Sequence, residues 1–149
     1  MASTVQNATL AITLDEKLVL NGKNRGNKIS YTLSNIDEVS QRILTVPSSG
    51  EITAATFGAA VAGGTYVTDN VRYIRVSNLD DTNWVRLRMF VDADTDKIAD
   101  ILLQPRQVFV LGSPKLSDTA VFSAFANLTS IKLQANTADV DVELMIASV

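Results

Sequence analysis

The chain has 149 residues, of which 46% are hydrophobic and 19% charged, and its net charge is −3. This composition excludes a disordered chain, and the acidic balance disfavours a nucleic-acid binder, which normally carries a basic surplus. The sequence holds no cysteine and no histidine, which excludes disulfides, thiolate metal sites and histidine-based acid–base catalysis.

The N-terminal third is predicted to begin with an arm and to continue in short strands. Residues 1–9 are small and polar, without the basic start and apolar run of a secretory signal, and we expect them to form the arm. Segments 10–14 and 29–33 alternate between apolar and polar residues, which predicts strands. The dipeptide Asn21-Gly22 between them predicts a tight turn.

The middle of the chain is harder to assign. Residues 34–39 are predicted to start a short helix, because a capping residue is followed by acidic residues. Residues 42–46 are predicted to form a strand that ends at Pro47. Residues 47–70 are rich in Gly, Ala, Ser and Thr, and we expect a long surface loop with one short strand near Phe57. The longest charge-free stretch, 52–67, is too polar for a membrane span.

The second half alternates more regularly. Strands are predicted over 71–77, 84–91, 107–111, 130–135 and 140–146, with turns at 78–83 and 136–139. Strict alternation serves a strand with one buried face. The residues expected to be buried on this ground are Val85, Leu87, Met89, Val140, Val142, Leu144 and Ile146.

Short strands at near-regular spacing, with turns between them, predict one all-β domain over residues 1–149. The expected architecture is a single antiparallel β-sandwich of the jelly-roll kind, and a small β-barrel is the alternative. No long segment shows the 3.6-residue periodicity of a helix.

The acidic segment 92–96 has a carboxylate at every second position, like the start of a calcium-binding loop. The pattern then departs from that loop, since Lys97 stands at the glycine position and Leu103 at the closing glutamate position. We expect a solvated acidic loop and no metal site. No nucleophile elbow or phosphate loop is present either, so we expect no enzymatic activity and no cofactor.

One strand carries the candidate interface. Trp84, Arg86, Arg88 and Phe90 share the face opposite the apolar one, and aromatic residues beside arginine are typical of interface cores. Arg72 and Arg75 on the preceding strand are expected to be neighbours of Arg86 and Arg88. The arginines could then form a basic patch, or they could pair with nearby aspartates, for which the candidates are Asp80, Asp81 and Asp92.

The segment from Val71 to Leu87, VRYIRVSNLDDTNWVRL, resembles small virion structural proteins of tailed bacteriophages, including phages of cyanobacteria. In these proteins a strand ends in an Asn-Leu-Asp-x-Thr turn and the next strand begins with an aromatic residue. Segments 103–111 and 131–147 resemble the later strand and the closing hairpin of the same group, and segments 20–22 and 36–47 are also similar. Arg106 departs from the pattern, because similar sequences tend to have glycine there.

The resemblance implies a non-enzymatic virion protein, made in the host cytoplasm. Such proteins are largely head decoration, cement, neck or tail components. We expect a capsid decoration or cement protein here, and a neck or tail component is the alternative. The implied partners are other virion proteins, the major capsid protein among them, and further copies of the chain, without a membrane or nucleic-acid partner. The arm 1–9 and the loop 47–70 are expected to make the contacts. A host-surface or sugar-binding module is an alternative of another class, for which Tyr66 beside Asp69 is the candidate.

Overall fold

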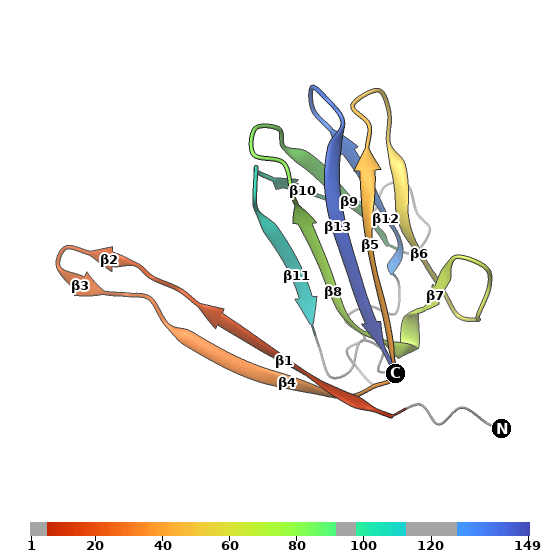
Figure 1. Ribbon diagram of the computed structural model, residues 1–149, viewed down its shortest axis with the longest axis horizontal. Coiled ribbons are helices and arrows are strands. Elements are labelled where there is room, and N and C mark those ends of the chain that lie inside the picture. The colour runs from red at the N-terminus through yellow and green to blue at the C-terminus, as the bar shows by residue number, and fades with distance from the viewer. Residues whose placement is uncertain (1–5, 92–97, 113–127) are drawn as a thin grey trace.

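The computed structural model describes residues 6–91, 98–112 and 128–149, and these form an all-β protein of mostly antiparallel sheets. Two larger sheets face one another, and a long two-stranded hairpin leaves one end of this body (Figure 1). Both larger sheets keep open edges, so the described strands form no closed barrel, which was the alternative expected from the sequence. Among the described residues, no helix has the length and hydropathy needed to cross a membrane.

The first of the larger sheets has four antiparallel strands in the order β11-β8-β13-β5. β8 and β13 pair in the middle, and β11 and β5 form the two edges. Their bounds are β5 Glu38–Val46, β8 Val71–Asn78, β11 Val108–Gly112 and β13 Val140–Ser148.

The second larger sheet has five strands in the order β10-β9-β12-β6-β7. All its pairs are antiparallel except β6 with β7, which is parallel. The bounds are β6 Ile52–Gly58, β7 Thr65–Val67, β9 Val85–Val91, β10 Ile98–Leu103 and β12 Leu128–Ala135. The short 3-10 helix η1, Thr68–Asn70, leads from β7 into β8 of the other sheet.

The main core lies between the two sheets and draws large side chains from both. Most of the residues that alternation marked as core are confirmed, since Val85, Leu87 and the four of β13 are buried. Met89 is only partly buried but packs against the same core. Arg86 and Arg88 point to the outer face, so the predicted register of this strand is correct.

The long loop expected over 47–70 is instead mostly β6, β7 and η1, although the short strand expected near Phe57 is present within β6. Strand β6 pairs with β12 inside the five-stranded sheet, and Ala54, Ala55 and Phe57 on it are buried. A shift in the β12 register opposite this strand lets two consecutive alanines point inward. Because of this irregularity the sequence of β6 lacks the strict apolar–polar alternation of a strand, and its many small residues are also typical of a loop.

The expected helix at 34–39 was also wrong. Strand β4, Lys28–Ile36, runs to the end of the hairpin, and β5 begins at Glu38. Asn35 adopts a left-handed conformation with φ 61°, at a point where the pairing with the opposite strand shifts. Asparagine tolerates this conformation, so the residue that could cap a helix serves here as a bulge that turns the chain into the body.

Residues 104–107 form a tight turn in which Arg106 occupies a position that favours glycine. The amide of Gln107 donates to the carbonyl oxygen of Gln104 at 3.0 Å, and Arg106 has φ 61°. This is the arrangement of a type II turn with proline at its second position, whose third position favours glycine. Arg106 therefore holds a conformation that its Cβ disfavours.

We expect Arg106→Gly to raise the free energy of unfolding by about 1 kcal/mol, because the strain of the left-handed side chain disappears. The ion pair from Arg106 to Asp81, at 3.7 Å and exposed, contributes little. Arg106→Ala, which loses the pair but keeps the strain, is the control. Urea unfolding of the three proteins checks this, and a less stable glycine variant would contradict it.

Candidate interaction surfaces

The sequence-predicted interface lies on the outer face of the five-stranded sheet. Arg86, Arg88 and Phe90 point outward from β9, and Trp84, just before the strand, is partly exposed beside Arg86. The four residues thus lie together at one face, as the alternation indicated.

Ion pairs satisfy the cations on this face. Glu51 lies 3.1 Å from Arg86, 3.5 Å from Arg88 and 3.5 Å from Lys132. Arg88 also donates two hydrogen bonds to Asp100, at 2.7 and 2.8 Å. The Lys132 ammonium lies 4.6 Å from the centre of the Phe90 ring. Three cations and two carboxylates of the described residues thus form a paired network on this face rather than a free basic patch.

The partners of these arginines differ from those expected. Arg72 and Arg75 lie on β8, in the other sheet, because the turn 79–84 carries the chain across from one sheet to the other. Arg75 pairs with Glu143 at 2.7 Å on the outer face of the four-stranded sheet. Segment 92–97, with its calcium-like pattern and Asp92, lies outside the described residues.

The Arg88 pair gives a testable pH dependence. Hydrogen bonds from Arg88 lower the pKa of Asp100 below its ordinary value of 3.8. A carboxyl with a lowered pKa stabilises the fold above its ordinary value, and the contribution disappears as the pH falls through the folded value. When the pH is lowered from about 5 to about 2, we expect the melting temperature of the Asp100→Asn variant to fall by less than that of the wild type. Asp139→Asn, on an exposed turn, is the control, and equal losses would contradict the assignment.

The second surface is the hairpin formed by residues 8–36, here called the hairpin arm (Figure 1). Strand β1, Ala8–Asp15, pairs with β4, and the short strands β2, Val19–Leu20, and β3, Lys23–Asn24, pair near the tip. The structure thus has a projecting hairpin that the sequence analysis did not predict. Of the predicted arm 1–9, residues 8–9 lie in β1 and residues 1–5 lie outside the described part of the chain.

One face of the hairpin arm is an apolar ladder. Directly opposed pairs place large apolar side chains on the same face, since alternate residues of a strand share a face. These pairs are Leu10 with Leu33, Ile12 with Tyr31, and Leu14 with Ile29. The other face is polar, and there Thr13 and Ser30 hydrogen-bond across the strands at 3.0 Å.

The inner part of the ladder is attached to the body. Leu33 and Ile36 are buried with Tyr73 of β8 and Ala147 of β13, and Leu10 and Ile12 pack against them. Gly112 at the end of β11 lets the arm lie close, because a Cβ there would be 2.7 Å from the Tyr31 hydroxyl. The arm thus lies on one end of the outer face of the four-stranded sheet.

Among the residues that the structure describes, none supports the outer part of the ladder in this way. We call residues 14–29 the distal arm, which extends beyond β11 into open space (Figure 1). Its large apolar side chains are all about half exposed or more, namely Leu14, Leu18, Val19, Leu20 and Ile29. A group of exposed apolar side chains at one place is typical of a surface that binds a partner.

The tip is built as a hairpin by local sequence. Asn21 and Gly22, with φ 51° and 73°, form the predicted two-residue turn between Leu20 and Lys23. At Gly26 the two strands come so close that a Cβ would lie 1.9 Å from the Glu16 carbonyl oxygen. Only glycine allows this approach, so the sequence specifies the shape of the distal arm.

The sequence contained a signal for this arm. The alternating segments 10–14 and 29–33 lie at equal distances from Asn21-Gly22, as in one hairpin. Alternation alone does not distinguish a strand inside a sheet from a strand in a free hairpin, because both have one apolar face.

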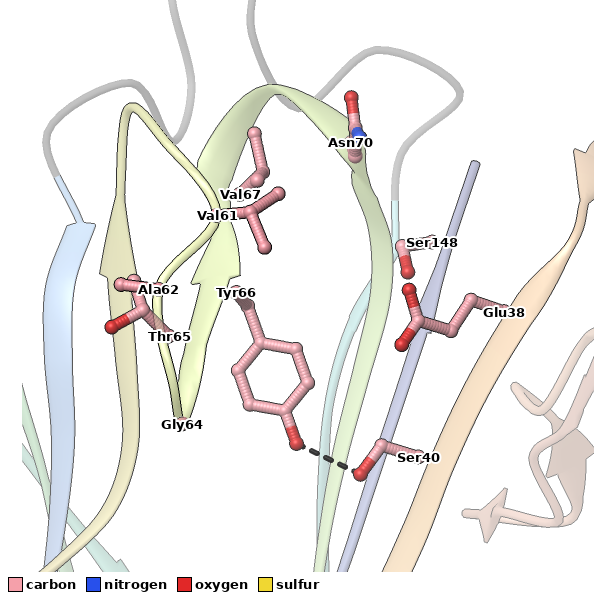
Figure 2. A pocket seen from close by; sticks show the side chains of 10 residues that line it. All are labelled: Glu38, Ser40, Val61, Ala62, Gly64, Thr65, Tyr66, Val67, Asn70 and Ser148. Atoms are coloured by element: carbon pink, nitrogen blue, oxygen red, sulfur yellow. Dashed lines mark hydrogen bonds between the residues drawn. The ribbon is translucent and has the colours of Figure 1, made fainter.

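A hollow of about 350 Å³ lies where the free edges of the two sheets meet (Figure 2). Across it Tyr66 of β7 donates a hydrogen bond to Ser40 of β5 at 2.8 Å, and the Tyr66 ring packs on Phe57. Asp69 does not line this hollow, whose carboxylate comes from Glu38. Tyr66 and Asp69 are therefore not brought together in it.

Comparison with protein-family models, curated proteins and solved structures found no match to this chain. Within the described residues, His, Cys, Asp and Glu side chains form no group of three that could hold a metal ion.

Proposed function

We propose that the protein is a non-enzymatic structural component of a tailed-phage virion, a capsid decoration or cement protein that acts by protein–protein association. The observation that carries the proposal is the distal arm. Its exposed apolar side chains extend from a body that has a core of its own. A hairpin of two strands is at best marginally stable alone in water, so an arm of this kind gains stability when a partner covers it.

The order of strands supports the virion part of the proposal. Each connection except β9 to β10 passes from one larger sheet to the other, once the small strand β7 is set aside. Numbered along the chain, the strands then have the order 1-8-3-6 in one sheet and 2-7-4-5 in the other. We infer a jelly-roll sandwich, an architecture that viral capsid proteins share with lectins and cupins.

Lectins and cupins use the same architecture, so fold alone does not choose among these functions. A sugar site would need an exposed aromatic face beside polar groups, whereas the Tyr66 ring packs on Phe57 and its hydroxyl is bound to Ser40. The distal arm favours association over sugar binding. A neck or tail position is the second candidate location, since an arm can bind neighbours at any of these places.

The experiment is a binding assay with phage particles assembled without this protein. Purified wild-type protein and the double variant Leu14→Lys, Ile29→Lys are mixed with the particles and sedimented. Both side chains are exposed, so the fold should be kept, and we expect the variant to bind at least about tenfold more weakly, because two apolar contacts are replaced by charges.

Val61→Lys is the matched control, since Val61 is the most exposed large apolar residue in the described part of the chain and lies outside the arm. The control should bind like the wild type. Wild-type protein with no affinity for particles would overturn the virion proposal. Equal binding by wild type and the arm variant would overturn the role of the distal arm.

A further inference from the structure

We propose that the distal arm of one copy docks on the outer face of the four-stranded sheet of a second copy, next to strand β11, and that two copies exchange arms in this way. The inference rests on the proposed role of the distal arm in association, and it names the surface that the arm binds.

The first argument is the direction of the ladder. Its inner part, with Leu10 and Leu33, already packs on the outer face of the four-stranded sheet around Tyr73 and Ala147. The outer pair, Leu14 with Ile29, lies on the same face of the hairpin, four residues further along each strand. By alternation this pair faces the same way as the inner ladder, while the part of the hairpin that carries it extends beyond the β11 edge (Figure 1).

The second argument is that each copy offers such a surface. Strand β11 is an edge strand, and its outward side chains Val108 and Val110 are 49% and 42% exposed. They lie on the same outer face that the inner ladder already contacts, since the β11 register continues to Gly112 beside Tyr31. A second copy placed across this edge would bring its valines to the distal arm.

The third argument is charge. Residues 1–36 carry four basic and two acidic side chains, a net charge of +2, and the total of −3 therefore leaves −5 for residues 37–149. The basic side chains of this segment are all in or next to the distal arm, at Lys17, Lys23, Arg25 and Lys28. An arm is attracted to the body of another copy, whereas two bodies without arms repel each other.

A reciprocal exchange suits these surfaces. When each copy gives an arm and receives one, the same patch occurs on both sides of a twofold axis, which is the commonest symmetry of homo-oligomers. Both arms and both pairs of valines are then covered, so the apolar area removed from water is doubled. The second copy is the occupant that matches the arm in apolar character at β11 and in the net charge of its residues 37–149.

Because the chain has no cysteine, single cysteines report this contact without background. Tagged protein carrying Leu14→Cys or Ile29→Cys is mixed with untagged protein carrying Val108→Cys or Val110→Cys and oxidised mildly. We expect at least one of these pairings to form the mixed disulfide about tenfold faster than pairings with Val61→Cys, because docking raises the effective concentration of the two thiols. A disulfide also needs Cα atoms within about 7 Å, so the reaction reports close contact.

Light scattering on the full chain gives the second measurement. The wild type should have the mass of a dimer, twice the chain mass of 16.1 kDa. The double variant Leu14→Lys, Ile29→Lys should have the mass of a single chain, while Val61→Lys should remain a dimer. A wild-type monomer at all concentrations, or cross-linking no faster than with Val61→Cys, overturns the inference.

These outcomes separate the inference from the proposed function. A monomer that still binds particles through its arm refutes the exchange of arms and leaves the virion role standing. A dimer that the arm variant breaks, but that has no affinity for particles, supports the exchange and refutes the virion role.

Discussion

Replacing Leu87 by alanine is expected to lower the free energy of unfolding by about 2–5 kcal/mol. Leu87 is fully buried at the centre of β9, between β10 and β12, and faces the core between the two larger sheets. Its loss removes apolar contacts with both sheets and leaves a cavity that the close-packed neighbours fill only in part.

Leu102→Ala is the matched control for this substitution. Leu102 lies on β10 of the same sheet, but it faces outward and is 46% exposed. Leu102→Ala should lower the free energy of unfolding by less than about 1 kcal/mol, because a side chain that stays exposed in the folded state gains little free energy from burial. Urea unfolding of the three proteins decides, and equal costs at the two positions would contradict the assigned register of β9.

The second large effect is expected at Asn78, the most buried polar residue among those described. Its amide nitrogen donates to the carbonyl oxygens of Asn83, Leu103 and Gln104, at 2.9, 3.2 and 3.1 Å. Its side-chain oxygen accepts from the amide of Asp80 at 3.0 Å. One side chain thus ties the end of β8 to the turn 79–84 and to the end of β10.

Asn78→Ala should lower the free energy of unfolding by about 3 kcal/mol, because these backbone groups lose their partner at a place that water reaches poorly. Asn78→Asp should be comparably unstable, since a carboxylate has nearly the same shape but cannot donate to carbonyl oxygens. Asn70→Ala, at an exposed position, is the control. An Asn78→Asp variant as stable as the wild type would show that shape, and not hydrogen bonding, makes the residue necessary.

Where alternation was strict, the sequence was sufficient to predict strands and their buried faces. Strands β9 and β13 have one buried and one solvent-facing side, so each residue type reports its own environment. The Asn21-Gly22 turn was predictable for a similar reason, because its backbone conformation favours these two residues.

Prediction was wrong where tertiary contacts override local pattern. Strand β6 buries two consecutive alanines at an irregularity in pairing that depends on the partner strand β12. Asn35 serves as a bulge because Ile36 is buried against Tyr73, a contact between distant parts of the chain. Which strands are neighbours also depends on the whole topology, and this is why Arg75 and Arg86 proved to lie in different sheets.

The candidate sites were also predictable only as far as local alternation determines them. The outward face with Trp84, Arg86, Arg88 and Phe90 followed from alternation, but its partner Glu51 comes from a segment expected to be loop. The distal arm was missed, because nothing in a single strand pattern tells whether its apolar face meets the protein's own body. The structure shows that the inner half does so and the outer half does not.

The central claim is that a partner surface covers the distal arm. Amide hydrogen exchange of residues 14–29 tests it most directly, measured in dilute free protein and in protein bound to particles. We predict rapid exchange of the arm in free protein diluted until it is monomeric, and strong protection on binding, while β12 and β13 in the core keep the same rates in both states. Equal exchange of residues 14–29 in the free and bound protein would contradict the account.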